Sequence, residues 1–467
     1  MNLPNMIEAK KRTKNLVNYE YFNIDKNNAF LNKKYYIKTY GCQMNVHDSE
    51  EIKALLEMIG FTNTDNMDES DLVILNTCAI RENAHDKVFG FLGRCKHLKQ
   101  TNKDLIVCLC GCMAQEESVV NEILNKHKYI DIVFGTHNIE ELPNMLLNKI
   151  NITNINVYSK EGNVIEVNNL YKRDSNISAW VNIMYGCDKF CTYCIVPYTR
   201  GKQRSRKSVD ILKEINELIK NGYKEITLLG QNVNAYGKDL KDEMSFQELL
   251  ESVAKTGIER IRFVTSHPWD FTDEMIDTIA EYDNIMPYIH LPLQSGSDKI
   301  LKLMGRRYTK DEYIKLFDKI KSKIKNVAIT TDIIVGFPNE SERDFKDTLD
   351  VVNYCKYDSA FTFIFSPREN TPAANMKDDV TTEIKEKRLQ ELNKIVNKYS
   401  LINNKKLVNT YQKVLLTEVS EKDNSKLCGY TETMKLVNVS CDKKLIGTIQ
   451  EVLITDAKSF SLDGIIK

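Results

Sequence analysis

Six strand-length apolar runs alternate with amphipathic helical patterns between residues 173 and 403, and no other feature constrains the fold of this chain as much. The runs lie at 180–184, 225–229, 260–264, 286–290, 328–334 and 359–365. Helical patterns intervene, for instance at 209–220, 311–324 and 342–354. Alternating strands and helices form a parallel sheet that the helices cover. We therefore expect an α/β fold with six β/α units in a partial TIM-like barrel, whose functional site lies at the carboxyl ends of the strands.

The same alternation occurs in a shorter region, from residue 33 to about 150. Short apolar runs at 35–39, 72–75 and 105–109 are each followed by a helical pattern, at 47–59, 81–99 and 114–126. This pattern predicts a separate N-terminal domain that is Rossmann-like, with a parallel sheet and covering helices.

The two ends of the chain differ from these regions. Residues 1–32 are rich in Lys and Asn, which is typical of a flexible or loosely docked extension. The tail contains β-rich segments separated by turn residues, at 414–419, 435–439 and 445–454. Such segments predict a small antiparallel β-barrel. The expected division is a flexible extension over 1–32 and domains over 33–150, 173–403 and 406–467.

The bulk composition is that of an ordinary globular protein. Of 467 residues, 42% are hydrophobic and 28% are charged. The chain has no apolar run long enough to cross a bilayer and no secretory signal at its start, so we expect a cytoplasmic protein with no membrane partner. Twelve cysteines in such a chain indicate metal or cluster ligation rather than disulfide bonds.

Three of these cysteines lie in one short loop after the first predicted barrel strand. Cys187, Cys191 and Cys194 have the spacing CxxxCxxC. Three local thiolates can hold three irons of a four-iron cluster and leave the fourth iron open to bind a small molecule. A zinc knuckle and ordinary core cysteines are the alternatives. Zinc prefers a closed site of four ligands, and no further Cys or His follows at a short spacing.

Three other cysteines each follow a different predicted strand of the N-terminal region. Cys42, Cys78 and Cys112 stand just past the carboxyl ends of these strands. Ligands of open α/β sheets bind at this edge. Each cysteine taken alone would be interpreted as a buried core residue. The three equivalent positions together predict a second three-thiolate cluster site.

The remaining cysteines are expected to be structural. Cys108 and Cys110 share a strand face with Cys112 if the strand is regular. We expect Gly111 to turn the chain, so that Cys112 reaches the site while Cys108 and Cys110 stay in the core. Spacing gives no partners to the others, which are Cys95, Cys355, Cys428 and Cys441.

Polar or glycine-containing sequences follow the other barrel strands as well. Candidate contacts for a small molecule bound at this rim are Gly230, Gln231, Asn232, Ser266 and Gln294. For each of them taken alone, a turn or a helix cap is the alternative.

The charges of the chain balance, with 65 Lys and Arg against 65 Asp and Glu. Nucleic-acid binding therefore has to use local basic patches. One candidate is the segment 200–207, which carries five cations in eight positions directly after the cysteine loop. It is either a solvated charged loop or a contact for a substrate phosphate or a cofactor.

Several longer motifs are similar to those of one family. They are Tyr-Gly-Cys-Gln-Met-Asn at 40–45, Asn-Thr-Cys-Ala-Ile-Arg-Glu at 76–82, Gly-Cys-Met-Ala-Gln at 111–115, Cys-Thr-Tyr-Cys-Ile-Val-Pro-Tyr-Thr-Arg-Gly at 191–201 and Leu-Pro-Leu-Gln-Ser-Gly-Ser at 291–297. On these motifs the chain, from about 33 to 467, resembles the radical S-adenosylmethionine (SAM) methylthiotransferases. Gln43 and Met44 match the branch of this family that acts on dimethylallyladenosine in tRNA. Departures from the family pattern occur at Lys202-Gln203, Glu369-Asn370 and Tyr430.

The resemblance implies a reaction, its cofactors and its partners. It implies transfer of a methylthio group to carbon 2 of dimethylallyl(isopentenyl)adenosine next to the tRNA anticodon, with two SAM molecules and two 4Fe-4S clusters, one on each set of three cysteines. It makes the rim residues candidates for contact with SAM or substrate. Tyr193 would pack against the adenine of SAM, with ordinary loop packing as the alternative. The tail would be a TRAM domain that binds the tRNA anticodon stem-loop, and a flavodoxin or ferredoxin would donate electrons.

Other functions stay open at this point. A methylthiotransferase of this kind would alternatively act on another modified adenosine or on a ribosomal protein. A non-catalytic iron–sulfur protein and a zinc-dependent RNA-binding module are further classes. An electron carrier normally has every cluster iron ligated by protein, whereas both cysteine sets are one ligand short.

Overall fold

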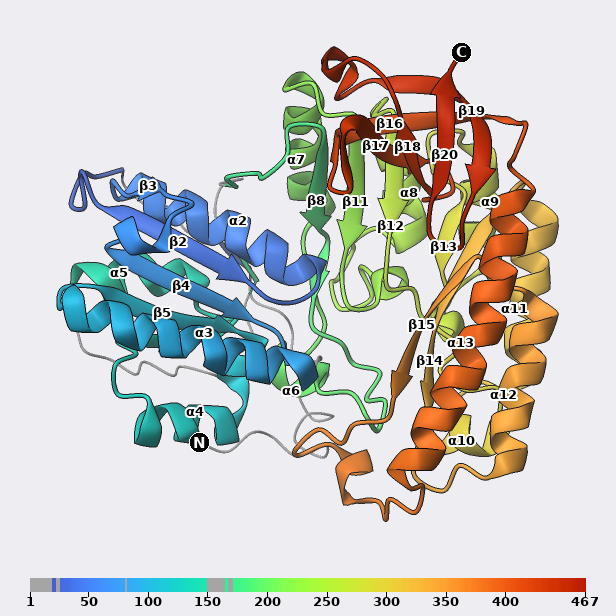
Figure 1. Ribbon diagram of the computed structural model, residues 1–467, viewed down its shortest axis with the longest axis horizontal. Helices are drawn as coiled ribbons and strands as arrows, with labels where there is room; N and C mark the ends of the chain where they lie inside the picture. The colour runs from blue at the N-terminus through green and yellow to red at the C-terminus, as the bar shows by residue number, and fades with distance from the viewer. Residues whose placement is uncertain (1–18, 22–25, 80–81, 149–163, 167–170) are drawn as a thin grey trace.

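The computed structural model describes residues 19–21, 26–79, 82–148, 164–166 and 171–467. Its N-terminal part is a five-stranded parallel sheet in the order β3-β2-β4-β5-β6 (Figure 1). The strands are β2 (Lys34–Thr39), β3 (Thr62–Asn63), β4 (Leu72–Thr77), β5 (Ile106–Gly111) and β6 (Ile132–Phe134). The helices are α2 (Gln43–Met58), α3 (Glu82–Thr101), α4 (Glu117–Lys126) and α5 (Leu142–Leu147). The predicted Rossmann-like sheet is confirmed.

The central strand β4 shows why the sequence signal was clear there. All of its residues are buried, because apolar cores cover both faces of the sheet. Ile74 belongs to the core that includes Ile52 of α2, and Val73 belongs to the opposite core, which includes Val88 of α3. A strand that is buried on both faces requires a continuous apolar run.

The middle of the chain forms the predicted partial barrel. Two three-stranded parallel sheets, β8-β11-β12 and β13-β14-β15, are connected by a parallel bridge between Ile261 and Ile285. The strands are β8 (Ser178–Asn182), β11 (Glu225–Leu229), β12 (Arg260–Phe263), β13 (Tyr288–His290), β14 (Ala328–Val335) and β15 (Ser359–Ile364). The helices are α7 (Ser208–Lys220), α8 (Phe246–Ala254), α9 (Asp273–Glu281), α10 (Asp298–Leu303), α11 (Lys310–Lys323), α12 (Glu342–Cys355) and α13 (Thr382–Lys405). One apolar core joins these strands to their helices.

The tail folds into a closed five-stranded barrel in the order β16-β17-β18-β20-β19. Its strands are β16 (Tyr411–Ser420), β17 (Asp423–Thr431), β18 (Leu436–Val439), β19 (Ile449–Ala457) and β20 (Leu462–Ile466). All pairs are antiparallel except β18 with β20, which is parallel. The sequence did not reveal β17, because its first half is polar and exposed and shows no apolar alternation.

The C-terminal barrel lies at the amino ends of the central strands (Figure 1). Two buried arginines of β12 hold it there. Arg260 donates hydrogen bonds to the carbonyl oxygens of Lys413 and Tyr430, each at 2.9 Å. Arg262 donates to the carbonyl oxygen of Thr431 at 2.8 Å and to the Glu225 carboxylate at 2.8 Å. Backbone carbonyls of the tail thus satisfy guanidinium groups that would otherwise be costly to bury.

The N-terminal extension is docked wherever the structure describes it. Strand β1 (Tyr19–Tyr21) pairs in parallel with β7 (Val164–Glu166). The hydroxyl of Tyr19 donates to the Asp210 carboxylate of α7 at 3.0 Å. Further along, Phe30 stacks on Phe61 with ring centroids 4.5 Å apart. Residues 1–18 and 22–25 lie outside the described ranges, and a flexible or loosely docked extension over 1–32 stays a prediction.

Within those ranges, no helix is long and apolar enough to cross a membrane. The domain limits at 33–150, 173–403 and 406–467 stay a prediction.

Candidate iron–sulfur and SAM site

The cysteines of the N-terminal sheet meet at its carboxyl edge, as the sequence predicted. Cys42 is the N-cap residue of α2, Cys78 directly follows β4, and Cys112 begins the 3-10 turn η2 (Cys112–Gln115) after β5. The Cys78 thiol donates a hydrogen bond to Cys42, and the charge of Cys42 acts on Cys112. These three residues, here called the sheet trio, come from three separate loops. Their role as cluster ligands stays a prediction.

A turn at Gly111 sends Cys112 toward the sheet trio. Gly111 has φ +92°, and a Cβ on it would collide with the carbonyl oxygen of Thr77. Only glycine fits such a position without strain. Cys108 and Cys110, before the turn, are buried in the apolar core of the sheet. The expected division between core cysteines and Cys112 is present.

Asn45 of α2 holds the backbone around the sheet trio. Its Oδ1 accepts a hydrogen bond from the Cys42 backbone N–H at 3.3 Å. Its Nδ2 donates to the Thr77 carbonyl oxygen, at 3.2 Å, and to Asn76 Oδ1, at 3.1 Å. One amide thereby links the loop after β2 to the end of β4, a role that the motif at 40–45 contains but spacing alone did not reveal.

The second set of cysteines, here called the loop trio, lies at the carboxyl end of β8. The Cys187 N–H donates to the Gly201 carbonyl oxygen at 3.2 Å, and the Cys194 N–H donates to the Cys191 carbonyl oxygen at 3.0 Å. Arg306 Nη1 donates to Cys191 Sγ at 3.4 Å. Burial, with the charges of the neighbouring thiols, raises the pKa of Cys187 and raises that of Cys194 to about 12.

A buried arginine also contacts the sheet trio. Arg200 follows the short helix α6 (Val196–Thr199) and donates from Nε to Cys112 Sγ at 3.2 Å and from Nη2 to Asp48 Oδ2 at 2.6 Å. Burial raises the pKa of Cys112. The hydrogen bond from Cys78, together with the charge of Arg200, lowers the pKa of Cys42 to about 6.

The two trios are connected through adjacent residues of one loop. The side chain of Arg200 contacts Cys112, while the carbonyl oxygen of Gly201 accepts the hydrogen bond from Cys187. The loop segment with Arg200 and Gly201 thus contacts one cysteine of the sheet trio and one of the loop trio.

The basic segment 200–207 is mostly buried, which is inconsistent with the first of its two interpretations, a solvated charged loop. Arg200, Lys202, Arg204 and Arg206 are between 0% and 6% exposed. Arg206, for example, donates from Nη1 to Glu214 Oε2 at 2.8 Å and to the Asn182 carbonyl oxygen at 2.7 Å. A contact of this segment with a substrate phosphate or a cofactor stays a prediction.

A network of buried charges also connects the N-terminal sheet region to the barrel. Arg173 donates from Nη1 to Glu50 of α2 at 2.8 Å and pairs through Nη2 with Glu214 of α7. The ring nitrogen Nδ1 of His47, also on α2, lies 2.9 Å from the Asn182 side chain of β8. The polar face of α2 is therefore buried against the barrel, and the sheet trio at its start is fixed relative to the loop trio.

The donor sets fit iron–sulfur clusters better than a single metal ion. Across the part of the chain that the structure describes, no group of three or more His, Cys, Asp or Glu side chains could hold one metal ion. A four-iron cluster makes a different demand, because each thiolate binds its own iron. Buried thiols with raised pKa values also need a cation to release their protons, and thiolates are the soft ligands that iron–sulfur clusters use.

Polar atoms without partners gather at the barrel rim. Gln231 Oε1, Asn232 Oδ1 and Ser266 Oγ are buried and have no hydrogen-bond partner among the described residues. Buried polar atoms are rarely left unpaired, so these oxygens fit a bound molecule with hydrogen-bond donors, such as the amino group of SAM. Gly230 is closely packed, since a Cβ there would collide with Met184. Gln294 has φ +72°, a strained conformation typical of functional rims.

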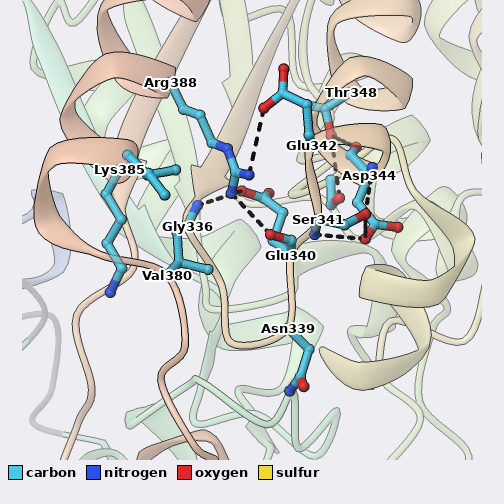
Figure 2. Close-up of polar contacts among 12 residues, drawn as sticks. Gly336, Asn339, Glu340, Ser341, Glu342, Asp344, Thr348, Val380, Lys385 and Arg388 are labelled. Atoms are coloured by element: carbon cyan, nitrogen blue, oxygen red, sulfur yellow. Dashed lines mark hydrogen bonds and ion pairs between the residues drawn. The ribbon is translucent and has the colours of Figure 1, made fainter.

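Tyr193 of the loop trio segment packs against protein in this structure. Its ring meets Phe337 edge-on, with centroids 6.5 Å apart. Phe337 lies in the turn after β14. Glu340 stabilises this turn (Figure 2), because its Oε2 accepts hydrogen bonds from the Gly336 N–H at 2.7 Å and from Arg388 Nη1 at 2.8 Å. Ordinary loop packing of Tyr193 is thus observed, and its contact with SAM stays a prediction.

Comparisons with known proteins agree with this geometry. Three family profiles match the chain: the Radical SAM superfamily over residues 181–352, the Uncharacterized protein family UPF0004 over 34–135 and the TRAM domain over 405–467. The solved structure of the radical S-adenosylmethionine methyltransferase TsrM from Kitasatospora setae, with cobalamin and a 4Fe-4S cluster bound, superimposes with a TM-score of 0.54. It covers 73% of this chain and 77% of TsrM at 13% identity, which shows the fold alone. Fold and profiles together define a radical-SAM protein.

Relatives with higher sequence identity show which family of radical-SAM proteins the chain belongs to. The tRNA-2-methylthio-N(6)-dimethylallyladenosine synthase of Staphylococcus aureus strain MRSA252 is 53% identical over 470 residues, 99% of this chain and 91% of that protein. The synthase of strain JH9 matches to the same extent. The chain belongs to the same family as these synthases, the radical-SAM methylthiotransferases, as its motifs predicted.

Proposed function

We propose that the protein transfers a methylthio group to carbon 2 of dimethylallyladenosine next to the anticodon of tRNA. The observation that carries the proposal is the connection of two three-cysteine sites through Arg200 and Gly201. An enzyme that activates an unreactive carbon and delivers sulfur to it has to hold the two reacting groups in a fixed relation, which two connected sites can provide. The identity of 53% to synthases of this name supports the choice of substrate.

The loop trio would hold a 4Fe-4S cluster whose open iron binds SAM, and the sheet trio would hold a second cluster. Such groups supply the one-electron chemistry that substitution at an unactivated C–H bond requires, while the protein supplies position and exclusion of water. A flavodoxin or ferredoxin would serve as electron donor, and the cytoplasm as location.

The residues around the trios have distinct tasks in this proposal. Arg306, held by the Pro292 carbonyl oxygen at 3.1 Å and the Tyr308 hydroxyl at 2.9 Å, orients Cys191. Arg200 orients Cys112 in the same way. Both guanidinium groups are buried, so their hydrogen bonds to the two sulfurs are formed without competition from water.

The barrel rim would bind SAM. Gln231, Asn232 and Ser266 offer oxygens there that have no partner within the described part of the chain. Gly230, Gln294 and Tyr193 complete the set of expected contacts. The substrate base has to leave the stacked anticodon loop to reach this rim, as base-modifying enzymes in general require. The C-terminal barrel would hold the remainder of the anticodon stem-loop.

The test is an anaerobic assay of the reconstituted full chain with SAM, a reductant and RNA that carries dimethylallyladenosine. Mass spectrometry of the digested nucleosides should find a methylthio adduct on that nucleoside, and none on a matched RNA with plain adenosine. Cleavage of SAM without an adduct would redirect the proposal to another modified adenosine or a ribosomal protein. Iron-loaded protein that cleaves no SAM would overturn the enzymatic function.

A further inference from the structure

Strand β15 exposes two large aromatic side chains, Phe361 at 55% and Phe363 at 46%. The residue between them faces the other way, because the Thr362 hydroxyl donates to Asn393 Oδ1 of α13 at 2.6 Å. Ala360 packs against the core beneath the helices as well. Since side chains alternate along a strand, Phe361 and Phe363 point away from α13 and toward the interior of the barrel.

The neighbouring strand confirms this direction. In the β14–β15 ladder, Asp332 is opposite Phe361 and Ile334 is opposite Phe363. Ile333, between the two, is fully buried in the core that the helices cover. The inward face of the two strands therefore carries an apolar patch, here called the phenylalanine patch and made of Phe361 and Phe363, with a carboxylate at its border.

A polar pair lies beside the phenylalanine patch. His290 Nε2 is 3.3 Å from Asp332 Oδ2, and its Nδ1 is 3.0 Å from Thr330 Oγ1. The His290 ring meets Phe361 edge-on, with centroids 6.0 Å apart. Apolar and hydrogen-bonding groups thus adjoin on one wall of the barrel.

The phenylalanine patch lies just below the rim with the loop trio. Phe365, two residues beyond Phe363, belongs to the apolar cluster against which Tyr193 packs. Two residues of a strand span roughly 7 Å. After β15, the chain returns to the cysteine loop, where the Ala373 N–H donates to the Thr192 carbonyl oxygen at 2.9 Å. A substrate at this rim would have the patch within reach.

Exposed phenylalanines on the inward wall of a barrel are suited to an apolar ligand, since burial of these two side chains would be favourable. We propose that the phenylalanine patch receives the dimethylallyl substituent of the substrate adenosine and makes the protein prefer RNA that carries it. This inference rests on the proposed function. The substituent sits on an amine that keeps one N–H donor, and the Asp332 carboxylate beside the patch is a matching acceptor.

The test compares two synthetic anticodon stem-loops that differ only in the dimethylallyl group. Their dissociation constants are measured on anaerobically reconstituted full-length protein, and nucleoside products are analysed in parallel. Wild-type protein should prefer the prenylated RNA. The Phe361→Ala/Phe363→Ala variant should lose roughly tenfold or more of that preference, as expected for apolar groups in a hydrophobic pocket, with unchanged affinity for the plain RNA.

The matched control is Thr362→Val, on the same strand but the opposite face, which should leave the preference unchanged. Phe363→Leu should retain most of it, because an apolar side chain remains. An unchanged preference in the double alanine variant overturns the inference. So does a failure of this variant to cleave SAM in an assay that contains no RNA, because that result would assign the patch to SAM binding. Wild-type protein that forms the product but binds both RNAs equally overturns this inference alone; absence of product overturns the proposed function.

Discussion

Arg200 donates a hydrogen bond from Nε to the sulfur of Cys112 at 3.2 Å, although 88 residues separate them in sequence. The same guanidinium pairs with Asp48 at 2.6 Å, and both side chains are buried. The next residue, Gly201, contacts Cys187 of the other trio through its carbonyl oxygen. The relative position of the two cysteine sites therefore depends on the short loop that contains Arg200 and Gly201. Substitution of Arg200 or Asp48, which form its ion pair, tests this dependence.

Replacement of Arg200 by Met should destabilise the iron-free protein by about 3–5 kcal/mol, because the Asp48 carboxylate is left buried without a partner. Urea denaturation followed by circular dichroism measures this change. The double variant Arg200→Met/Asp48→Asn should recover much of the loss, since the uncompensated charge is gone. An unfolding midpoint in Arg200→Met equal to that of wild type would show that the pair is dispensable.

Gly111→Ala should impair the sheet trio specifically, because a Cβ at this position collides with the Thr77 carbonyl oxygen and displaces Cys112. Reconstituted protein should then bind about four irons per chain rather than about eight. Gly222→Ala is the matched control: Gly222 also has a positive φ, of +84°, but no atom lies within 4 Å of its Cβ position. Equal iron contents in the two variants would contradict the assigned role of the turn.

The turn after β14 should make stability depend on pH through Glu340. Burial raises the pKa of this carboxyl from 4.5 to about 7, against the opposing effects of the Gly336 N–H and Arg388. The folded protein therefore holds a proton that the unfolded chain releases above pH 4.5. The stability associated with this group is fully present below pH 4.5 and is lost as the pH rises through about 7. Over this range the free energy of unfolding should fall by about 3 kcal/mol in total.

Glu340→Gln removes the titrating group and serves as the reference. The free energy of unfolding of wild type minus that of Glu340→Gln should fall over this pH range, as measured by urea denaturation at several pH values. A difference that stays constant with pH would mean that the carboxyl is ionised in both states.

Arg262→Met should loosen the C-terminal barrel, because Glu225 and the carbonyl oxygens of Thr431 and Glu432 lose their shared donor. A loss on the order of 3 kcal/mol is expected for a buried pair of this kind. Limited proteolysis should cut the variant between α13 and β16 faster than wild type. The control Lys413→Met removes an exposed cation 3.9 Å from Glu432 and should have almost no effect. Equal cleavage rates in the two variants would contradict the docking role.

The sequence predicted those parts of the structure that local pattern determines. The strand at 225–229 is predicted at its observed limits, because three of its five residues are apolar and all five are buried. The three residues of the sheet trio were identified because the carboxyl ends of parallel strands meet at one edge. Short or polar strands such as β3 and β17 gave no such pattern.

Contacts between residues that are far apart in the sequence could not be predicted, for a different reason. Nothing in the spacing of Arg200 or Arg306 indicates that each meets a cysteine sulfur, since such pairs depend on how the loops pack. A solvated, exposed loop is one of the two interpretations that the sequence allows for the segment 200–207, because charge runs usually are solvated. Its burial depends on acidic partners, such as Asp48 and Glu214, that lie on other elements.

The most direct test of the two-site account compares Cys78→Ala with Cys191→Ala, with the core variant Cys110→Ala as control. Each reconstituted protein receives SAM, reductant and RNA with dimethylallyladenosine, and both SAM cleavage and the methylthio nucleoside are quantified. We expect Cys191→Ala to abolish SAM cleavage, Cys78→Ala to cleave SAM without forming the methylthio product, and Cys110→Ala to retain both activities. Normal product from Cys78→Ala or from Cys191→Ala would contradict the account.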